Sequence, residues 1–451
     1  MSMALGEMGV EECVRAVKAR RLSAVDLAEA ALDRIAEQNE RLNAATHILR
    51  DRALAEAAAV DEKIAAGEDP GPLAGVPYGV KDLCDVKGLP TTAGAGRLRA
   101  APPAAADAAA VTRLRRAGAV LVATLNMDEF AYGFVTDNAH WGITRNPHDP
   151  DRFAGGSSGG SAVAVAAGML PFSIGSDTNG SIRVPASLCG IFGIKPTHGS
   201  MPMEGIYPLA HSLDDIGIFA RSAGDLALVD VVLREAGGRF AEPLSRPALL
   251  GGWFADNLAP EMQQALDCFD AVLGPLPRFV PNGVGQARSA AFLITAYEGG
   301  RLHHDALRAD PMSYDPSTRD RLLAGAALPD QVYELALAFR DIFRAEIEKA
   351  FARYDVLIAP SAYGPAPLIS HPYIRIDGAE QPARANLGLY TQPISYLGLP
   401  VVAAPLRSAG LPLGIQLIAR PGCDAHLIRF AEELEGMGLI RAVPPSGLSF
   451  D

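Results

Sequence analysis

Two glycine- and serine-rich segments carry the residue types best suited to acyl chemistry. The first covers residues 154–161 (AGGSSGGS) and the second covers residues 176–183 (SDTNGSIR). Glycine lets the backbone approach another backbone or a ligand closely, and it tolerates positive φ. Small residues over 162–168 follow the first segment and Pro185 follows the second, which predicts a helix after each. Both segments therefore predict serines on tight turns beside helix N-termini, where free N–H groups favour negative charge.

A serine nucleophile needs a base, and the sequence offers two kinds. Histidine would be a common partner, but His303, His304 and His426 lie in charged, helical surroundings. Lys81 is the better candidate, because it ends an apolar strand and desolvation lowers the proton affinity of a buried lysine. Lys87 follows in a polar turn, where solvent would keep it charged. From these residues alone, a salt-bridged structural lysine stays open as the alternative for Lys81.

Two overlapping matches to G-x-S-x-G, at residues 155–159 and 156–160, raise the alternative of an α/β-hydrolase. That fold places its serine on a sharp turn directly after a strand. The preceding residues, Asp-Arg-Phe-Ala, form a poor strand. This alternative predicts Ser157 or Ser158 as the nucleophile, with a histidine as its base.

The elements that must position these residues alternate between helices and strands. Hydrophobic periodicity and composition predict helices over residues 11–20, 23–40, 50–66, 105–118 and 332–351. Short apolar runs predict strands over residues 72–81, 119–124, 171–176, 354–361 and 399–405. This alternation indicates an α/β protein with a largely parallel or mixed sheet. The last helix has an apolar stripe that we interpret as a core face: Val332, Leu335, Phe339, Ile342, Phe343, Ile347 and Phe351.

We expect the whole chain, residues 1–451, to form one domain. Residues 71–200 make its glycine- and serine-rich core, and residues 1–70 and 223–353 make helical layers that cover it. Residues 365–384 are the most loop-like stretch and are expected to border the pocket. Ser23 and Asp26 resemble a capping box at the start of one covering helix.

The composition limits the classes of partner. A net charge of −12 argues against a nucleic-acid partner, because phosphate binding needs a basic face. A small anionic substrate stays open, since the field of a pocket can oppose the global charge. The five cysteines are scattered, and the N-terminus lacks signal-peptide features, which predicts a cytoplasmic protein. No apolar run approaches about 18 residues, so we expect no membrane span.

Three motifs resemble those of a known family. Gly79-Val-Lys81-Asp82, residues 155–161 and residues 177–183 stand in the order and spacing of the amidase signature enzymes. Further matches at residues 42–44, 355–360 and 413–421 extend the resemblance over nearly the whole chain. The resemblance implies a mixed central sheet of about eleven strands with helices on both faces. It also outweighs the salt-bridged alternative for Lys81.

The resemblance implies a Ser–cis-Ser–Lys triad that needs no metal or cofactor. Ser181 matches the nucleophile, Ser157 matches the bridging serine on a cis peptide, and Lys81 matches the general base. The backbone N–H groups of the segment that ends at this nucleophile form the oxyanion hole in the family, which here means Thr178, Asn179, Gly180 and Ser181.

The substrate pocket is less well defined by the sequence. Tyr132 and Gln392 are candidate lining residues, each with loop ordering as the alternative. The side chain of Asn179 either enters the pocket or hydrogen-bonds its own turn. The sequence singles out no arginine for a substrate carboxylate, although Arg97 and Arg145 are candidates.

Asn179 stands where many members of the family have glycine, and asparagine tolerates positive φ better than other non-glycine residues. Together with residues 127–134 and 145–148, it resembles a branch that hydrolyses the ureide 1-carboxybiuret to urea-1,3-dicarboxylate and ammonia. The resemblance implies a small helical accessory protein, and a homodimer or a heterotetramer. The alternatives are another small-amide hydrolase, the glutaminase-type component of an amidotransferase, and an inactive paralogue that serves as a scaffold.

Overall fold

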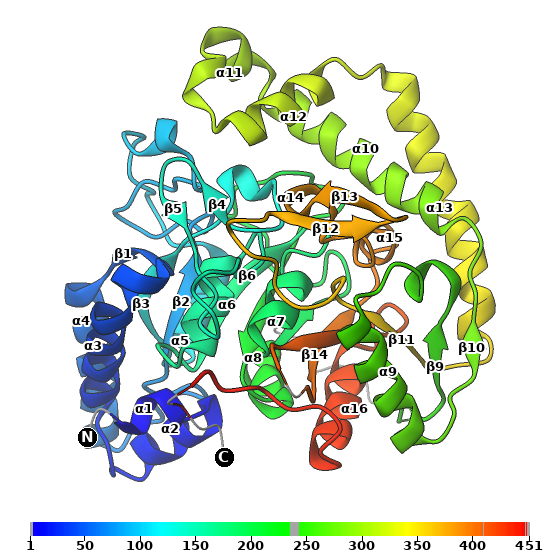
Figure 1. Cartoon of the computed structure of the whole chain (residues 1–451). Coiled ribbons are helices and arrows are strands. Elements are labelled where there is room, and N and C mark those ends of the chain that lie inside the picture. The colour runs from blue at the N-terminus through cyan, green and yellow to red at the C-terminus, as the bar shows by residue number, and fades with distance from the viewer. Residues whose placement is uncertain (1–2, 235–242, 409, 447, 449–451) are drawn as a thin grey trace.

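The computed structural model describes residues 3–234, 243–408, 410–446 and 448, and its centre is an eleven-stranded mixed sheet (Figure 1). Across the sheet the strands follow in the order β1 (Ala45–Ile48), β3 (Val120–Leu125), β2 (Pro77–Lys81), β6 (Phe172–Asp177), β8 (Asp215–Ala220), β7 (Phe192–Lys195), β14 (Val401–Leu406), β15 (Leu413–Ile418), β11 (Val356–Pro360), β9 (Pro247–Leu250) and β10 (Arg278–Phe279). β2 is parallel to β3 and β6, and β9 is parallel to β11 and β10. The other neighbours in the sheet are antiparallel. The expected mixed sheet of about eleven strands is confirmed.

The strands at the centre of the sheet are buried on both faces. Every residue of β3, β6, β8, β14 and β15 is buried, which is typical of a sheet covered by helices on each side. The covering helices before the middle of the chain are α1 (Met3–Glu7), α2 (Val10–Lys18), α3 (Ala24–Leu42), α4 (Arg50–Ala66), α5 (Ala109–Arg116), α6 (Gly159–Ala166), α7 (Arg183–Cys189) and α8 (Ala223–Arg234). Those that follow are α9 (Pro260–Leu273), α10 (Val284–Leu302), α11 (His304–Ala309), α12 (Pro316–Ala326), α13 (Asp330–Phe351), α14 (Ala383–Asn386), α15 (Gln392–Ser395) and α16 (Asp424–Gly436).

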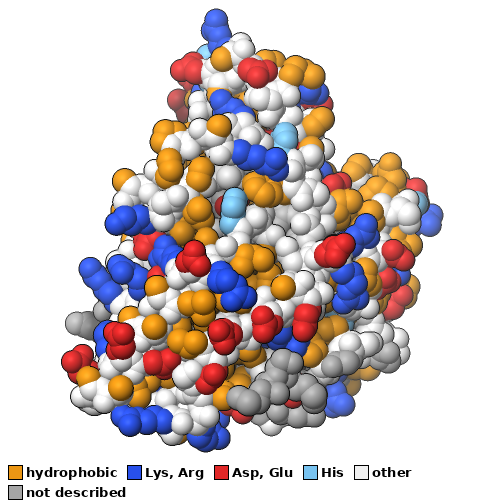
Figure 2. Space-filling model, turned by 90° about the vertical axis from the view of Figure 1, so that its left-hand side faces the viewer, with side chains coloured by type: hydrophobic (Ala, Val, Ile, Leu, Met, Phe, Trp, Pro, Cys, Tyr) orange, Lys and Arg blue, Asp and Glu red, His pale blue; other side chains and the backbone are white. Residues whose placement is uncertain are grey.

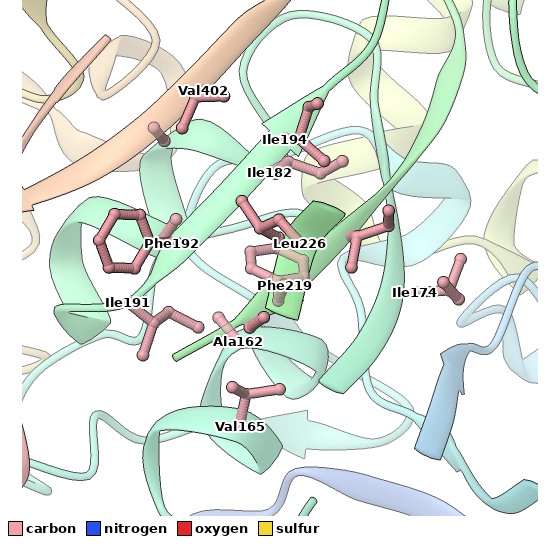
Figure 3. Close-up of a cluster of buried hydrophobic side chains, with 14 of the residues drawn as sticks. Ala162, Val165, Ile174, Ile182, Ile191, Phe192, Ile194, Phe219, Leu226 and Val402 are labelled. Atoms are coloured by element: carbon pink, nitrogen blue, oxygen red, sulfur yellow. The ribbon is translucent and has the colours of Figure 1, made fainter. Parts of the chain in front are cut away.

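The core beside the glycine- and serine-rich segments is formed by side chains from two strands and two helices. Phe192 of β7 and Phe219 of β8 lie among residues such as Val165 of α6 and Leu226 of α8 (Figure 3). All four side chains are buried. This packing supports β8, which pairs with β6, the strand that leads into the second segment.

The predicted capping box is present at the start of α3. Ser23 Oγ accepts a hydrogen bond from the backbone N–H of Asp26 (2.9 Å), and the Asp26 carboxylate accepts one from the backbone N–H of Ser23 (2.8 Å). The two bonds satisfy N–H groups that have no partner inside the helix. The predicted helix over residues 50–66 matches α4 at both ends.

Helices α10–α13 form the layer at the top and right of Figure 1, and the stripe on α13 differs from the prediction. Phe343, Ile347 and Phe351 are buried, as predicted, but Leu335 is 72% exposed and Ile342 is 65% exposed. The stripe is therefore only partly a core face. Regular spacing places apolar residues on one side of a helix. Which of these residues are buried depends on how far the neighbouring elements extend along the helix.

Two regions expected to lack strands contain them. Residues 365–384 include a hairpin of β12 (Tyr373–Ile376) and β13 (Ala379–Pro382), which continues into α14, so the prediction of a loop was wrong there. The helical layer over residues 223–353 contributes β9 and β10 to the edge of the sheet, and its residues 235–242 lie outside the described part. These strands are two to four residues long, too short for alternation to be recognised.

The surface in Figure 2 carries acidic and basic side chains interspersed, and the molecule narrows toward the top, where Figure 1 places α11. A second small hairpin pairs β4 (Asp137–Asn138) with β5 (Gly142–Ile143). Across the part of the chain that the structure describes, no helix has both the length and the apolar character that crossing a membrane requires.

Candidate active site

The last residue of β2 places an amine inside the protein. Lys81 is fully buried, and its Nζ donates to Ser157 Oγ (2.7 Å) and to Ser176 Oγ (2.9 Å). Ser176 lies on β6, the strand next to β2, and Ser157 lies just before α6. The structure thus brings together the lysine and one of the two serines that the sequence selected.

Burial governs the charge of this amine. Desolvation lowers the pKa of Lys81 to about 7, although the carboxylates of Asp128 and Asp177 act in the opposite direction. Among the described residues, none forms an ion pair with Lys81. The structure therefore does not support the alternative that Lys81 is a salt-bridged structural lysine. Near neutral pH a substantial fraction of such an amine is neutral and able to accept a proton.

The peptide bond between Gly156 and Ser157 is cis. A Cβ at Gly156 would lie 2.3 Å from Asp128 Oδ2 and 2.6 Å from the backbone N of Val135. A side chain at this position would therefore collide with the loop that contains Asp128 and Val135. Glycine is needed here because it lets the two backbone segments approach each other closely. The same holds for Gly160, where a Cβ would lie 2.4 Å from a backbone oxygen and a backbone nitrogen.

Ser181 lies on the turn between β6 and α7, beside the first glycine- and serine-rich segment. Its backbone carbonyl accepts a hydrogen bond from the N–H of Ser158 (3.3 Å), the residue that follows Ser157. Ser181 lines a pocket, while Ser157 and Lys81 do not contribute to the lining. The two serines and the lysine therefore come from three separate segments that meet at the carboxyl ends of β2 and β6.

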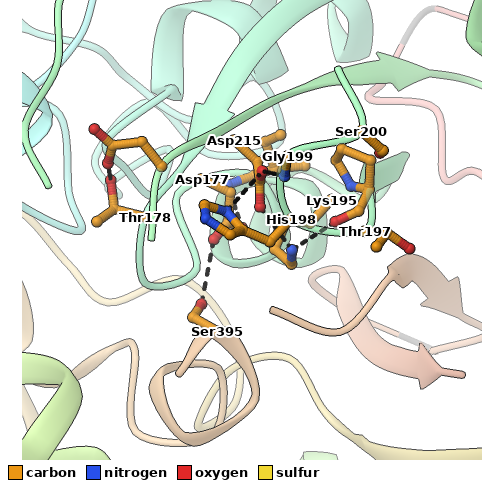
Figure 4. A network of polar contacts seen from close by, with 12 residues as sticks. Asp177, Thr178, Lys195, Thr197, His198, Gly199, Ser200, Asp215 and Ser395 are labelled. Carbon is orange, nitrogen blue, oxygen red and sulfur yellow. Dashed lines mark hydrogen bonds and ion pairs between the residues drawn. The ribbon is translucent and has the colours of Figure 1, made fainter. Parts of the chain in front are cut away.

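Asp177 organises the turn that carries Ser181. Its carboxylate accepts hydrogen bonds from the backbone N–H groups of Gly180 (2.7 Å) and Ile182 (3.1 Å), and it forms a buried ion pair with Arg183 (2.9 Å). Burial favours the neutral acid, but Arg183, Lys195 and the N–H of Ile182 together outweigh it and hold the pKa of the Asp177 carboxyl below its usual value. Figure 4 shows Asp177 with its further contact to Ser395 (3.5 Å). Asp177 and Arg183 therefore hold the turn.

The four residues expected to form the oxyanion hole differ in their contacts. The N–H of Gly180 is already engaged by Asp177. Gly180 also carries the positive φ of the turn (131°), and a Cβ there would lie 2.0 Å from Thr391 Oγ1. The positive φ thus falls on Gly180 and not on Asn179. Thr178 is fixed by its hydroxyl, which donates to Asp214 (2.6 Å; Figure 4).

Asn179 extends its side chain toward α10 and lines the pocket. Its Nδ2 donates to Thr295 Oγ1 (2.7 Å), while its Oδ1 is buried and has no hydrogen-bond partner among the described residues. The side chain does not hydrogen-bond its own turn. Of the two alternatives left open by the sequence, the side chain of Asn179 therefore enters the pocket. Its Oδ1 is an acceptor that no described residue uses there.

A small pocket lies beside Ser181. Both predicted lining residues, Tyr132 and Gln392, belong to it. Tyr132 follows Phe130 and Ala131, two non-glycine residues with positive φ, and its hydroxyl is buried without a partner among the described residues. The lining residues are Ala131, Tyr132, Gly133, Phe134, Thr178, Asn179, Ser181, Phe292, Thr295, Arg321, Ala385 and Gln392.

Several lining residues were missed from the sequence. Phe292 and Thr295 come from α10, and Arg321 comes from α12, in the layer interpreted as a cover for the core. None belongs to a motif, so no signal in the sequence marks them. The two arginines proposed from the sequence lie elsewhere. Arg97 donates to the hydroxyl of Tyr314 (3.2 Å) and Arg145 donates to the carbonyl of Pro150 (2.7 Å), and neither lines the pocket.

The described residues contain no group of three or more His, Cys, Asp and Glu side chains placed to hold a metal ion. The polar groups at the site are hydroxyls, an amine, an amide and backbone N–H groups. Such a set suits acyl transfer, in which a serine attacks a carbonyl carbon and donors stabilise the oxyanion.

Comparison with known proteins gives a consistent result. The Amidase family matches residues 26–239 and 302–428. The chain is 44% identical to AtzE, the 1-carboxybiuret hydrolase chain of Pseudomonas sp. (strain ADP), over 96% of this chain and 99% of that protein. It is 34% identical to a glutamyl-tRNA(Gln) amidotransferase chain of Synechococcus sp. (strain RCC307), over 94% of this chain and 96% of that one.

Solved structures agree with the sequence relatives. One, described as an inhibitor-bound vestigial protein complex that reveals the origins of an s-triazine catabolic enzyme, superposes with a TM-score of 0.93 at 43% identity and covers 97% of this chain and 100% of its own. An amidase crystal structure superposes with a TM-score of 0.89 at 34% identity, covering 95% of this chain and 100% of that one. With matches of this extent in sequence and in fold, the chain belongs to the amidase signature family and is an enzyme of the amidase class.

Proposed function

We propose that the protein is an amidohydrolase in which Ser181 is the nucleophile, Ser157 relays a proton and Lys81 is the general base. The observation that carries the proposal is the 2.7 Å contact between Lys81 Nζ and Ser157 Oγ, made by an amine whose pKa is lowered to about 7. Only a neutral amine can accept a proton. The position of Ser181 in the wall of the pocket supports its role as the attacking group.

In this mechanism Lys81 takes the proton of Ser157 while Ser157 takes the proton of Ser181. Ser181 Oγ attacks the amide carbon, and the carbonyl oxygen becomes an oxyanion. The C–N bond then breaks, and the proton returns through Ser157 to the departing nitrogen, which leaves as ammonia. Water attacks the resulting acyl-enzyme by the same route, releases the acid and restores the Ser181 hydroxyl.

The oxyanion is best assigned to the backbone N–H groups of Thr178, Asn179 and Ser181. The fourth candidate, Gly180, already donates to Asp177. The hydrogen bond from Thr178 to Asp214 and the ion pair between Asp177 and Arg183 fix this turn before substrate arrives. Preorganised donors of this kind make a large contribution to the rate, since they need no reorganisation during the reaction.

The substrate that we propose is 1-carboxybiuret, which would be hydrolysed to urea-1,3-dicarboxylate and ammonia. The support is the 44% identity to a protein named as a 1-carboxybiuret hydrolase, over nearly its full length. The small pocket, with an unpartnered acceptor on Asn179, is suited to a short ureide with N–H groups along its length. A second candidate is a glutaminase-type reaction, favoured by the 34% identity to glutamyl-tRNA(Gln) amidotransferase chains.

We also propose that the chain works together with a small helical accessory protein. The support is that a similar solved structure is described as a protein complex. Co-expression with the products of neighbouring genes, followed by light scattering on the purified enzyme, tests this part. A homodimer or a heterotetramer is expected, and a monomer with full activity would contradict it.

The experiment that tests the function is the release of ammonia from 1-carboxybiuret generated in situ, with Ser181→Ala as the blank. Biuret, glutamine and simple amides serve as competing substrates. We expect turnover of 1-carboxybiuret alone. Turnover of glutamine instead would favour the second candidate, whereas equal ammonia release by the Ser181→Ala variant would contradict the nucleophile.

A further inference from the structure

One face of α10 contacts two amide side chains in the wall of the pocket. Arg288, Phe292 and Thr295 follow one another at intervals of four and three residues, so they share that face of the helix. Phe292 and Thr295 line the pocket, and α15, which begins at Gln392, packs against α10 (Figure 1). The two amides, Asn179 and Gln392, come from distant segments of the chain, and each is hydrogen-bonded to α10.

Arg288 fixes the orientation of the Gln392 carboxamide. The Nε–H group of Arg288 donates to Gln392 Oε1 (3.1 Å). A guanidinium has N–H donors only, so it can hold the oxygen of a carboxamide and not its NH2 group. Gln392 is buried and lines the pocket, and its Nε2 makes no hydrogen bond to the part of the chain that the structure describes. The N–H donors of Gln392 Nε2 are therefore left for a ligand.

A second carboxamide holds Arg288 in place. Arg288 Nη2 donates to Asn386 Oδ1 (2.7 Å), and Asn386 Nδ2 donates to the carbonyl of Pro382 (3.0 Å). Among the described residues, no carboxylate lies at ion-pair distance from Arg288, and Arg288 itself does not line the pocket. The groups that this cation contacts are the two amide oxygens that it orients.

Thr295 fixes the second carboxamide in the opposite sense. The hydroxyl of Thr295 donates its single proton to the backbone carbonyl of Ala291 (2.9 Å), so the same oxygen can only accept from Asn179. It accepts from Asn179 Nδ2 (2.7 Å), which leaves Asn179 Oδ1 as the free end of that amide. This Oδ1 is buried and has no partner among the described residues. The wall of the pocket thus presents a donor from one amide and an acceptor from the other.

We propose that α10 fixes these amides as a complementary pair, with Gln392 as the donor and Asn179 as the acceptor, and that the pair selects a ureide over a simple diamide. Arg288 and Thr295 are the positioning residues of the pair. The pairing rests on the proposed function, because it names what the same site recognises. Gln392 Nε2 donates to a carbonyl oxygen of the ligand, and Asn179 Oδ1 accepts the N–H that lies between the two carbonyls of a ureide. A diamide with a methylene in that place leaves the buried Oδ1 unsatisfied, which costs binding free energy.

Two neutral ligands separate the acceptor from the donor. Biuret carries an N–H between its two carbonyls, and malonamide has a methylene in the same place. Both are titrated calorimetrically into enzyme carrying Ser181→Ala, which prevents turnover. We expect biuret to bind about 3- to 10-fold more tightly than malonamide, as for one hydrogen bond between neutral groups. Biuret that binds no more tightly than malonamide would overturn the pairing.

The isosteric variant Gln392→Glu, made in the same Ser181→Ala enzyme, tests the donor. A carboxylate keeps the shape of the side chain and its bond to Arg288, but it has no N–H and turns an oxygen toward the carbonyl of the ligand. We expect both ligands to bind at least about 10-fold more weakly, while the Tm is unchanged or raised by the new ion pair. A purely structural role for Gln392 predicts normal binding, so unchanged affinity in the folded variant would overturn the donor.

Variants of α10 test the positioning residues through the amides that they hold. Arg288→Met should weaken the binding of both ligands about 3- to 10-fold, and Arg288→Lys, which can still donate to Gln392 Oε1, should recover part of the loss. In a background that carries Gln392→Met, Arg288→Met should have no further effect. An effect of Arg288→Met that persists in that background would contradict its action through Gln392.

Thr295 offers a matched pair of variants. Thr295→Val keeps the shape without the hydroxyl, so it should weaken biuret binding about 3- to 10-fold and leave malonamide binding unchanged. Thr295→Ser keeps the hydroxyl and should restore the preference for biuret. An equal loss for both ligands in folded Thr295→Val would overturn the role of Thr295 in orienting Asn179.

Activity separates this inference from the proposed function. If the ligands and variants behave as expected but the unmodified enzyme does not hydrolyse 1-carboxybiuret, the proposed substrate fails and the pair of amides stands. If 1-carboxybiuret is hydrolysed and folded Gln392→Glu binds both ligands as before, the proposed function stands and the pair fails. Circular dichroism and the Tm show whether each variant is folded.

Discussion

Lys81 Nζ and Ser157 Oγ lie 2.7 Å apart inside the protein, although 76 residues separate them in the sequence. One group ends a central strand and the other precedes a helix, so the contact exists only in the assembled fold. Desolvation keeps the pKa of the amine near 7, which suits it to exchange protons with a hydroxyl.

Replacing Lys81 should abolish activity without destabilising the fold. Lys81→Met is expected to lower kcat/KM by at least about 10³-fold, within the range for loss of a general base, and to leave the Tm unchanged or raised. The buried amine has no ion-pair partner among the described residues, so its removal leaves no charge unpaired. Thermal melts and ammonia release measure the two effects.

Lys195 provides the matched control for that variant. It is also a buried lysine, but it forms an ion pair with Asp215 (2.9 Å; Figure 4). Lys195→Met should therefore destabilise the protein by about 3–5 kcal/mol, because the buried Asp215 carboxylate loses its lysine partner and keeps only the contacts to His198 (3.1 Å) and to the N–H of Gly199 (3.1 Å). A large loss of stability in Lys81→Met, or none in Lys195→Met, would contradict this account of the two sites.

The pH dependence of the reaction should follow the lowered pKa of Lys81. The amine accepts a proton only when neutral, so kcat/KM is expected to rise with pH through about 7 and then level off. A profile that is flat from about pH 5 to 9 would show that the base lies elsewhere.

The same group should make stability depend on pH. In the unfolded chain the pKa of a lysine is about 10.4, whereas burial lowers it to about 7 in the folded protein. Between these values the unfolded state binds more protons, so Lys81 contributes a penalty that is fully present below about pH 7 and disappears as the pH rises past about 10. Denaturant unfolding at several pH values should show Lys81→Met gaining most at low pH. A gain that instead grew with rising pH would contradict the assignment.

Asp177→Asn should damage both the turn and the fold. The substitution leaves Arg183 buried beside a neutral amide, and it replaces one of the acceptors that hold the N–H groups of Gly180 and Ile182. We expect a loss of about 3–5 kcal/mol in the free energy of unfolding, measured in urea, together with a large loss of activity. Unchanged stability would show that the ion pair does not support the turn.

Asn179→Ala should weaken substrate binding more than it slows the chemical step. It removes the unpartnered Oδ1 acceptor and the bond to Thr295, but it keeps the backbone N–H assigned to the oxyanion. We expect KM to rise by about 10-fold while kcat changes less, as for loss of one hydrogen bond. A selective fall in kcat at constant KM would assign the side chain to the transition state instead.

Much of the site could be predicted because its signals are local. The glycine- and serine-rich segments and the apolar strand that ends in Lys81 can be recognised from neighbouring residues in the sequence. The same is true of the capping box at Ser23 in the surrounding fold. The resemblance to a known family supplied the order of the three motifs. It also implied a catalytic role for Lys81, which the residues alone left open.

The remaining features depend on how distant elements pack. Leu335 and Ile342 continue a regular apolar stripe yet face solvent, because no described neighbour covers that part of α13. Thr295 and Arg321 reach the pocket from α10 and α12, which carry no motif. The short strands β12 and β13 are defined by their pairing with each other and not by their composition. Such contacts appear only once the chain is folded.

The most direct test of the triad is to locate the residue that a serine-directed fluorophosphonate modifies. The enzyme is labelled, digested and mapped by mass spectrometry, with Ser181→Ala and Ser158→Ala treated in parallel. The account predicts a single adduct on Ser181, lost in Ser181→Ala and retained in Ser158→Ala. An adduct on Ser157 or Ser158, or an adduct that persists in Ser181→Ala, would contradict it.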